Sequence, residues 1–314
     1  MSHPLNRYSA SKDIRQQMVT GSLVGDAYAL GTHWIYDLDR VESLLKPASG
    51  LQEPQRDTFH VGKHLGAQTH YGDQALMLFQ FLRANNGCYH GEGFRKFWVE
   101  QMKVYRGYQD TATRESITLL ESGHPYGYAS DELGGAARIA PILFWIEDPQ
   151  LAILAAVDQA RLTHQSAQSL LVTDLFTRTA VRLLAGEPGS IMDVLRSVRD
   201  ERAKQIRQAS QDDVLVQTQA DIRFFDRSLE NALSYLDRSP RETAMGLGQS
   251  CHAQHALPII LNILARNGDY RESLQFNSLV GGDSAARAML LGLLLGPSPF
   301  LLSRFPLRWR HLLI

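Results

Sequence analysis

Apolar residues recur at intervals of three and four positions through most of this chain, which is the spacing of one face of a helix. Patterns that alternate between apolar and polar residues, as strands do, are essentially absent. We therefore predict an all-α fold of roughly ten helices or more, packed around one another. The periodic segments are residues 92–105, 112–121, 134–146, 151–162, 167–184, 191–209, 221–236, 256–265 and 270–276.

Two further helices begin after a glycine-bearing turn that contains an aspartate. Residues 66–82 bring Asp73 to the start of an apolar helix, and residues 279–296 do the same for Asp283, which Ser284 follows. A carboxylate in such a place either caps free backbone N–H groups or faces a cation or a sugar hydroxyl. Because the arrangement occurs twice, we predict that both carboxylates face one pocket.

The first predicted helix, residues 11–31, contains small residues that allow another backbone to approach closely, so we expect it to be central. It leads into residues 32–37, where His33, Trp34 and Asp37 lie close together in the sequence. These residues form either a packed helix exit with satisfied hydrogen bonds or the wall of a pocket. In the second case Asp37 is a third pocket carboxylate.

Residues 46–69 show no sustained periodicity and contain several prolines and glycines, which predicts a long loop. Long loops in compact domains are commonly functional. This loop carries His60, Lys63 and His64, and His70 follows it. His60 and His64 have the spacing of two zinc ligands on one helix, but Gly62 lies between them and no helical pattern surrounds them. Contacts to a phosphate or a carboxylate are therefore the favoured interpretation.

Three other places combine polar groups with turns, namely residues 126–141, 163–166 and 250–255. For each, the favoured interpretation is structural. Arg138 is expected to be a paired arginine, Ser166 or Thr163 a helix cap, and the histidines satisfied by hydrogen bonds.

Composition limits the class of protein. Hydrophobic residues make up 44% of the chain and charged residues 21%, which suffices for a sizeable core. The formal charge is −1, so no bulk attraction to nucleic acid or to an anionic membrane is expected. Cys88 and Cys251 fit neither a disulfide framework nor a metal knuckle, and the first residues form no apolar signal segment, so we expect a cytoplasmic protein.

Two further features concern organisation. The most apolar run, residues 288–297, falls short of the ~20 residues of a membrane helix, so we expect a buried core helix. No linker rich in proline or serine and no block of charge divides the chain. We therefore predict one domain over residues 1–314.

Five motifs occur in the order seen in ADP-ribosylglycohydrolases, and the chain resembles that family over nearly its whole length. They are Gly25-Asp26-Ala27 with Gly31, Tyr71-Gly72-Asp73-Gln74, Gly134 to Pro141, Thr163-His164 and Gly281-Gly282-Asp283-Ser284. Residues 32–37 and 70–74 are most similar to the divergent branch that includes the lens J-crystallins, relatives with a non-enzymatic role.

The resemblance implies an all-α orthogonal bundle with a binuclear Mg²⁺ site, which removes ADP-ribose from modified side chains or cleaves related ribosides. It implies catalytic roles for Asp73, Asp37 and Asp283, and metal ligands among Asp73, Asp283 and Ser284. It also implies a small ADP-ribose-like ligand or an ADP-ribosylated substrate. We predict that this ligand is contacted by His33, Trp34, His60, His64, His70, Tyr71, Gly72, Gln74, His164 and Gly282.

The chain also departs from the family. Members usually read Thr-Asp-Asp-Thr where this chain has residues 72–75, and Asp-Thr-Asp-Thr/Ser where it has residues 283–286, so one aspartate of each pair is missing. At most three carboxylates, Asp73, Asp283 and Asp37, would face the charge of two Mg²⁺ ions, and uncompensated buried charge is costly. We therefore predict one Mg²⁺ or none.

Two functions follow from these departures. The first, which we favour, is a hydrolase acting on an ADP-ribosyl or related N- or O-ribosyl compound. The second is a non-catalytic protein that binds ADP-ribose or a nucleotide, or a crystallin-like structural protein.

Overall fold

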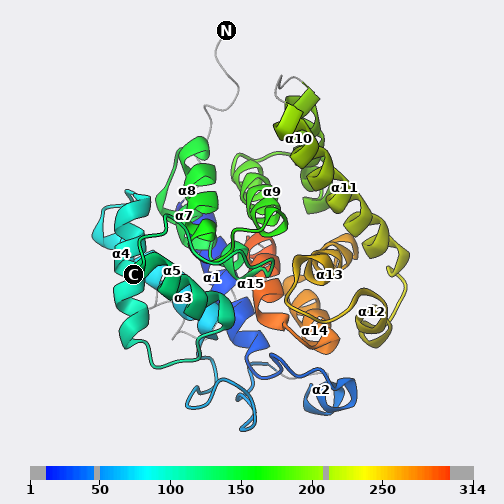
Figure 1. Ribbon diagram of the computed structural model, residues 1–314. Helices are drawn as coiled ribbons and strands as arrows, with labels where there is room; N and C mark the ends of the chain where they lie inside the picture. Colours follow the sequence, from blue (N-terminus) through cyan, green and yellow to red (C-terminus); the bar gives the residue numbers. More distant parts are fainter. Residues whose placement is uncertain (1–11, 46–49, 208–211, 298–314) are drawn as a thin grey trace.

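The computed structural model describes residues 12–45, 50–207 and 212–297. Within these residues the chain is all-α, as predicted, and the only β-type pairings are isolated bridges. Figure 1 shows the arrangement of the helices. They are α1 (Lys12–Ala29), α2 (Leu38–Leu44), α3 (His70–Ala84), α4 (Gly91–Val104), α5 (Thr111–Glu121), α6 (Gly134–Ala137), α7 (Ala140–Trp145), α8 (Pro149–Arg161), α9 (Ala167–Leu184), α10 (Ile191–Arg207), α11 (Asp212–Ser234), α12 (Pro240–Leu247), α13 (Ala253–Ala265), α14 (Tyr270–Val280) and α15 (Ser284–Leu295).

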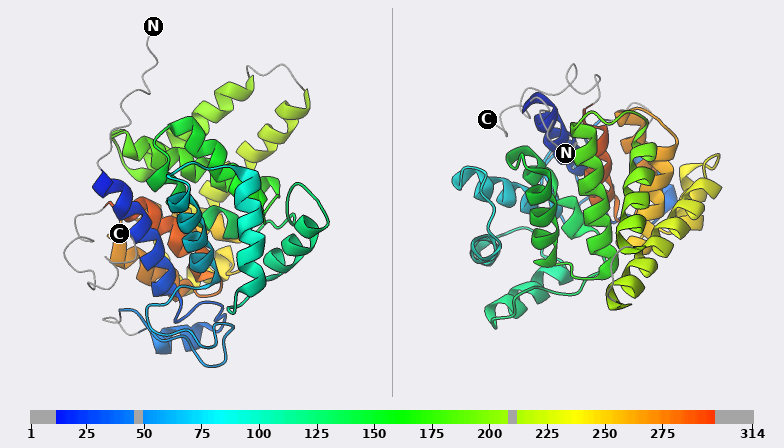
Figure 2. Two further views of the ribbon diagram at one scale, coloured as in Figure 1. Left: turned by 90° about the vertical axis from the view of Figure 1, so that its left-hand side faces the viewer. Right: turned by 90° about the horizontal axis from the view of Figure 1, so that it is seen from above.

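Helices α1 and α15 lie side by side at the centre of the molecule, although they come from opposite ends of the chain (Figures 1 and 2). Their contact is unusually close because glycines face backbone across it. A Cβ atom on Gly25 would lie 2.3 Å from the carbonyl oxygen of Ala288, and one on Gly21 would lie 2.3 Å from that of Gly292. The small residues of the first predicted helix therefore allow the close backbone approach that the sequence predicts.

The other helices surround this pair. Helices α3 and α7 pack on α1, whereas α6, α13 and α14 pack on α15. Two buried polar contacts fix the orientation of α1. Arg15 donates to the carbonyl oxygen of Leu143 (2.5 Å), and the hydroxyl of Tyr270 donates to the carbonyl oxygen of Gly21 (2.6 Å). Helix α2 and the loop before α3 lie together at one end of the molecule (Figure 1).

Most predicted helices are present, but some boundaries differ. The segment 134–146 forms two helices instead of one, because Pro141 lacks the N–H group that a continuous helix needs and occupies the first turn of α7. Helix α11 begins at Asp212 instead of residue 221. The short helices α2 and α12 were not predicted, since seven or eight residues show too little periodicity.

Other expectations concern individual residues. Cys88 and Cys251 are both free, and Ser166 caps α9 by accepting a hydrogen bond from the backbone of Ser169. In the part of the chain that the structure describes, none of the helices has the length and apolar character needed to cross a bilayer. Residues 46–49 of the predicted loop and residues 208–209 of the predicted helix 191–209 lie outside the described residues.

The contact between α1 and α15 generates a stability prediction. Replacing Gly25 with alanine places a methyl group against the backbone of α15, so we expect the free energy of unfolding to fall by about 1–3 kcal/mol despite the better helix propensity of alanine. The measurement is equilibrium unfolding in guanidinium chloride. The control is Gly50→Ala, because a Cβ atom at Gly50 has no neighbour within 4 Å. Equal stability of the two variants would contradict the proposed close contact.

Candidate functional site

The turn after α1 and the turn before α15 are joined by backbone hydrogen bonds. The backbone N–H of Trp34 donates to the carbonyl oxygen of Gly282, and the N–H of Gly282 donates to the carbonyl oxygen of Ile35. Both N···O distances are 2.8 Å, and the two segments form an antiparallel bridge. Trp34 has a φ angle of 62°, a left-handed conformation that is uncommon for a bulky residue. Gly281 and Gly282 also have positive φ angles, of 72° and 63°. Two motifs from opposite ends of the chain therefore meet at one place.

Asp283 is buried directly beside this bridge. Its Oδ2 atom accepts a hydrogen bond from the hydroxyl of Tyr71 (2.9 Å), and its Oδ1 atom lies 3.6 Å from Nδ1 of His33. Among the described residues Oδ1 has no hydrogen-bond partner, and the carboxylate does not cap α15. Burial raises the pKa of Asp283, although the positive charge of Arg287 acts in the opposite direction. The sequence motif thus delivers a buried carboxyl group with one free oxygen.

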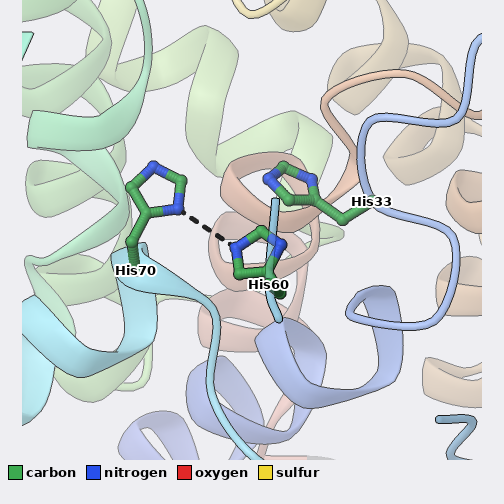
Figure 3. Close-up of side chains that lie close together, drawn as sticks. All are labelled: His33, His60 and His70. Carbon is green, nitrogen blue, oxygen red and sulfur yellow. Dashed lines mark hydrogen bonds between the residues drawn. The ribbon is translucent and has the colours of Figure 1, made fainter. Parts of the chain in front are cut away.

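His33, which lies beside Asp283, belongs to a group of three buried histidines, and Figure 3 shows their imidazole rings turned toward one another. His33 comes from the turn after α1, His60 from the loop before α3, and His70 is the first residue of α3. One ring nitrogen of each lies within 4.8 Å of the others, and Nε2 of His60 is 3.4 Å from Nδ1 of His70. Burial lowers the pKa of His33, and it lowers that of His60 to about 3, so both rings are neutral at neutral pH. We call this group the histidine cluster.

A second buried carboxylate supports the cluster from behind. Oδ2 of Asp110 lies 3.2 Å from Nε2 of His70, and Asp110 also caps α5 through the backbone N–H of Thr113. Burial acts to raise the pKa of Asp110, but the hydrogen bonds from His70 and Thr113 outweigh it and keep this pKa below its ordinary range. Asp110 is therefore an anion that orients His70.

Three aromatic rings lie against the histidine cluster. The ring of Trp34 stacks on His33 with a centroid distance of 4.4 Å, and the rings of Phe59 and Tyr108 lie 5.1 Å and 5.0 Å from that of Trp34. Phe59 is 57% exposed, which is unusual for so large an apolar side chain. These rings offer stacking surfaces for a planar ligand group.

The start of α3 is held by α1. Thr69, not Asp73, is the capping residue, and both its backbone N–H and its hydroxyl donate to the buried carboxylate of Asp26 over 2.6 Å. Burial raises the pKa of Asp26 to about 7, although the hydrogen bonds from Thr69 act against this. Gly72 leaves room for this contact, because a Cβ atom there would lie 2.4 Å from Oδ2 of Asp26.

Asp73 and Asp283 have different partners. The carboxylate of Asp73 is half-buried and accepts hydrogen bonds from the ammonium group of Lys63 and the hydroxyl of Tyr105. The carboxylate of Asp283 instead contacts Tyr71 and lies beside His33. A cation of the chain itself therefore already neutralises Asp73.

Other predicted site residues have varied surroundings. Asp37 is exposed and caps α2 by accepting from the backbone N–H groups of Asp39 and Arg40. His64 is exposed and does not belong to the histidine cluster, so His60 meets histidines from other segments instead of its neighbour in the loop. Ser284 is buried, and its hydroxyl has no hydrogen-bond partner among the described residues.

Gln74 and His164 belong to a buried network below the site. Arg138 donates to the side-chain oxygen of Gln74 (2.5 Å) and to the hydroxyl of Thr163 (2.6 Å). That hydroxyl lies 2.7 Å from Nδ1 of His164, and Trp98 also donates to Gln74 (3.0 Å). Arg138 is thus paired, as expected, and Gln74 joins α3 to the core.

One carboxyl group near Asp283 was not predicted. Oε1 of Glu132 accepts a hydrogen bond from the thiol of Cys251 (3.0 Å), and Glu132 forms a β-bridge with His252. The segment around Cys251 also contacts Asp283, because the backbone N–H of Asp283 donates to the carbonyl oxygen of Gln249 (3.0 Å). Glu132 is only half-buried; burial raises its pKa, the hydrogen bond from Cys251 acts against this, and repulsion from Asp110 and Asp283 adds to the rise. Glu132 is thus a second carboxyl group with a raised pKa, and it contacts the same segment as Asp283.

Sequence reasoning also missed Asp26 and Asp110. Asp110 has the signal of a helix cap, since it directly precedes the periodic segment 112–121. Asp26 is a charged residue within a helix of small and apolar residues, which indicates a special role. Glu132 has no comparable signal, because its position depends on the segment around Cys251.

Comparison with known proteins identifies the family and supports the fold. The family model for ADP-ribosylglycohydrolase matches residues 10–313, which is nearly the whole chain, and this confirms the predicted family. A solved structure called "ADP-ribosylglycohydrolase-related protein complex" superposes with a TM-score of 0.64 and 21% sequence identity, over 96% of this chain and 93% of that chain. At this identity the likeness concerns the fold. No curated protein matches the chain, and the J-crystallin-like branch stays a prediction.

The bridge beside Asp283 can be tested through Gly282. A Cβ atom there would lie 2.1 Å from the carbonyl oxygen of Gln249, in addition to the cost of a left-handed residue. We expect Gly282→Ala to lower the free energy of unfolding by about 1–3 kcal/mol more than Gly123→Ala. Gly123 also has a positive φ angle, of 88°, but open space around it, so this control costs only about 1–2 kcal/mol. Equal losses in chemical denaturation would rule out the tight junction.

Proposed function

We propose that this chain, which belongs to the ADP-ribosylglycohydrolase family, is a hydrolase that cleaves the bond at the anomeric carbon of a ribosyl group. Its substrate is an ADP-ribosyl compound or a related N- or O-riboside. The observation that carries the proposal is a pair of carboxyl groups that share one neighbouring segment, residues 249–252: buried Asp283 with one unpartnered oxygen, and the more accessible Glu132.

The two carboxyl groups suit different tasks in such a reaction. Cleavage at an anomeric carbon passes through an oxocarbenium-like transition state and is assisted by an acid that protonates the leaving group. We assign this acid to Glu132, because a carboxyl group with a raised pKa retains a proton closer to neutral pH. We assign to Asp283 the binding of a ribose hydroxyl through its free Oδ1, since the hydroxyl of Tyr71 fixes the other oxygen.

The aromatic rings complete the proposed substrate site. A planar base can stack on Trp34, Phe59 or Tyr108, and the exposed ring of Phe59 gives it access from solvent. The catalytic roles predicted for Asp73 and Asp37 stay predictions. Each of these carboxylates has other partners, Lys63 and Tyr105 for Asp73 and the backbone of α2 for Asp37.

The groups gathered here do not fit the family's Mg²⁺. Mg²⁺ requires octahedral coordination, almost always by oxygen atoms. Next to Asp283 the chain offers His33, whose partners in the histidine cluster also supply nitrogen atoms, and Asp73 is occupied by the ammonium group of Lys63. The predicted Mg²⁺ ligands Asp73, Asp283 and Ser284 therefore provide too few free oxygens, and we assign no catalytic step to Mg²⁺.

The ion pair between Lys63 and Asp73 also favours a second candidate function. An ammonium group paired with Asp73, the carboxylate that the family resemblance makes a metal ligand, fits a protein that binds ADP-ribose or a nucleotide without cleaving it. In that case ligand binding persists while turnover is absent.

The hydrolase proposal predicts the effect of two substitutions. In Glu132→Gln the amide cannot donate the proton, so we expect the rate of release of ADP-ribose or ribose to fall by about 10²–10⁴-fold. In Asp283→Asn we expect a comparable loss, because the sugar hydroxyl loses its charged acceptor. The control is Glu121→Gln, which removes an exposed carboxylate paired with Lys103. Unchanged turnover in both site variants would refute the assignment, and absence of turnover in the parent would favour the binding protein.

The oxygen-poor site makes a separate prediction about binding. We expect the affinity for ADP-ribose, measured by calorimetric titration, to be the same with and without added Mg²⁺. The physical reason is that the free oxygen ligands a Mg²⁺ ion needs are missing. Binding that requires Mg²⁺ would show that Asp73 leaves Lys63 to coordinate the ion.

A further inference from the structure

The histidine cluster has no role in the proposed hydrolysis. His33, His60 and His70 come from three different segments, yet their rings gather in the interior and each is at most 3% exposed. An anionic ligand is a poor occupant, because the buried carboxylates of Asp110 and Asp283 lie against these rings. Nε2 of His33 is buried and has no hydrogen-bond partner among the described residues. A buried polar atom without a partner is costly, so the cluster needs another explanation.

The spacing of the rings fits a tetrahedral metal ion. Two nitrogen atoms that each bind Zn²⁺ at about 2.0–2.1 Å with tetrahedral angles are separated by about 3.3–3.4 Å. Nε2 of His60 and Nδ1 of His70 lie 3.4 Å apart. One nitrogen of His33 lies within 4.8 Å of both, so a small rotation of its ring completes a set of three ligands.

The groups behind the cluster fit a divalent ion in both charge and geometry. Metal-binding histidines usually give their other ring N–H to a carboxylate, which fixes the tautomer and strengthens the ligand. Asp110 stands behind His70 at 3.2 Å, and Asp283 stands behind His33 at 3.6 Å. In the structure the backbone N–H of Ala285 donates to Nδ1 of His33 (3.3 Å). Binding of a metal ion at Nε2 requires the other tautomer, in which the Nδ1–H group is directed at Asp283 instead. Two buried carboxylates together balance the charge of one divalent cation.

We propose that His33, His60 and His70 form a binding site for one divalent transition-metal ion, with Zn²⁺ as the first ion to test. Imidazole ligands favour Zn²⁺, Cu²⁺, Ni²⁺ and Fe²⁺, and disfavour Mg²⁺ and Ca²⁺. Three histidines leave one position open for water. The site does not depend on the proposed hydrolase activity.

The test is metal binding by the full-length chain after treatment with a chelator and buffer exchange. Zn²⁺ is titrated against a chromophoric indicator, and the bound metal is counted by elemental analysis. We expect one tightly bound ion per chain. Co²⁺ in the same site should give the intense visible absorption of a tetrahedral ion, and Mg²⁺ should not displace it.

Three variants locate the ion. We expect His60→Ala to weaken Zn²⁺ binding by about a hundredfold or more, because it removes a ligand from a loop without disturbing a helix. Asp110→Asn retains all three ligands and should weaken binding about 10–100-fold through His70. The matched control is His64→Ala, an exposed histidine of the same loop, which should bind Zn²⁺ as the parent does.

The outcomes separate the alternatives. No saturable Zn²⁺ or Co²⁺ binding in the parent, or equal affinities of the His60→Ala and His64→Ala variants, would overturn the proposal. Circular dichroism without metal shows whether each variant is folded, and the Co²⁺ spectrum of the parent needs no variant. Because no readout uses turnover, a protein that binds Zn²⁺ but hydrolyses nothing refutes only the proposed function.

Discussion

The site depends on the contact between α1 and α15. Gly21 and Gly25 let the two backbones approach closely. In this arrangement the end of α1 and the start of α15 lie at the same end of the helix pair. Only then can Trp34 and Gly282 form their bridge and bring His33 next to Asp283. A wider separation of the helices would part the two motifs, whatever residues they carried.

The sequence predicts features that depend on local pattern. The helix periods, the close-contact glycines of α1 and the delivery of Asp283 to a helix start can all be read from neighbouring residues. The histidine cluster cannot, because the i,i+4 spacing of His60 and His64 misleads, and the partners of His60 come from distant segments. The ion pair of Lys63 with Asp73 also depends on the path of a loop that has no periodicity.

Charge explains why this site differs from the one the family resemblance implies. Each missing aspartate removes negative charge that would otherwise balance Mg²⁺, and the chain compensates in two ways. Lys63 neutralises Asp73 directly. Around the histidine cluster, imidazole rings take the place of further carboxylates, while Asp110 and Asp283 remain. The result is a place suited to one softer divalent ion instead of two hard ones.

Asp283 links the two proposals without making one depend on the other. The backbone of Asp283 contacts the segment around Cys251, and the proposed acid, Glu132, contacts the same segment. The carboxylate of Asp283 faces His33, where the proposed ion lies. A divalent ion at the cluster would favour the ionised form of Asp283, because an adjacent positive charge lowers the pKa of a carboxyl group. Glu132, which contacts Cys251 instead of the cluster, would be the carboxyl group left to hold a proton, and this agrees with its assignment as the acid.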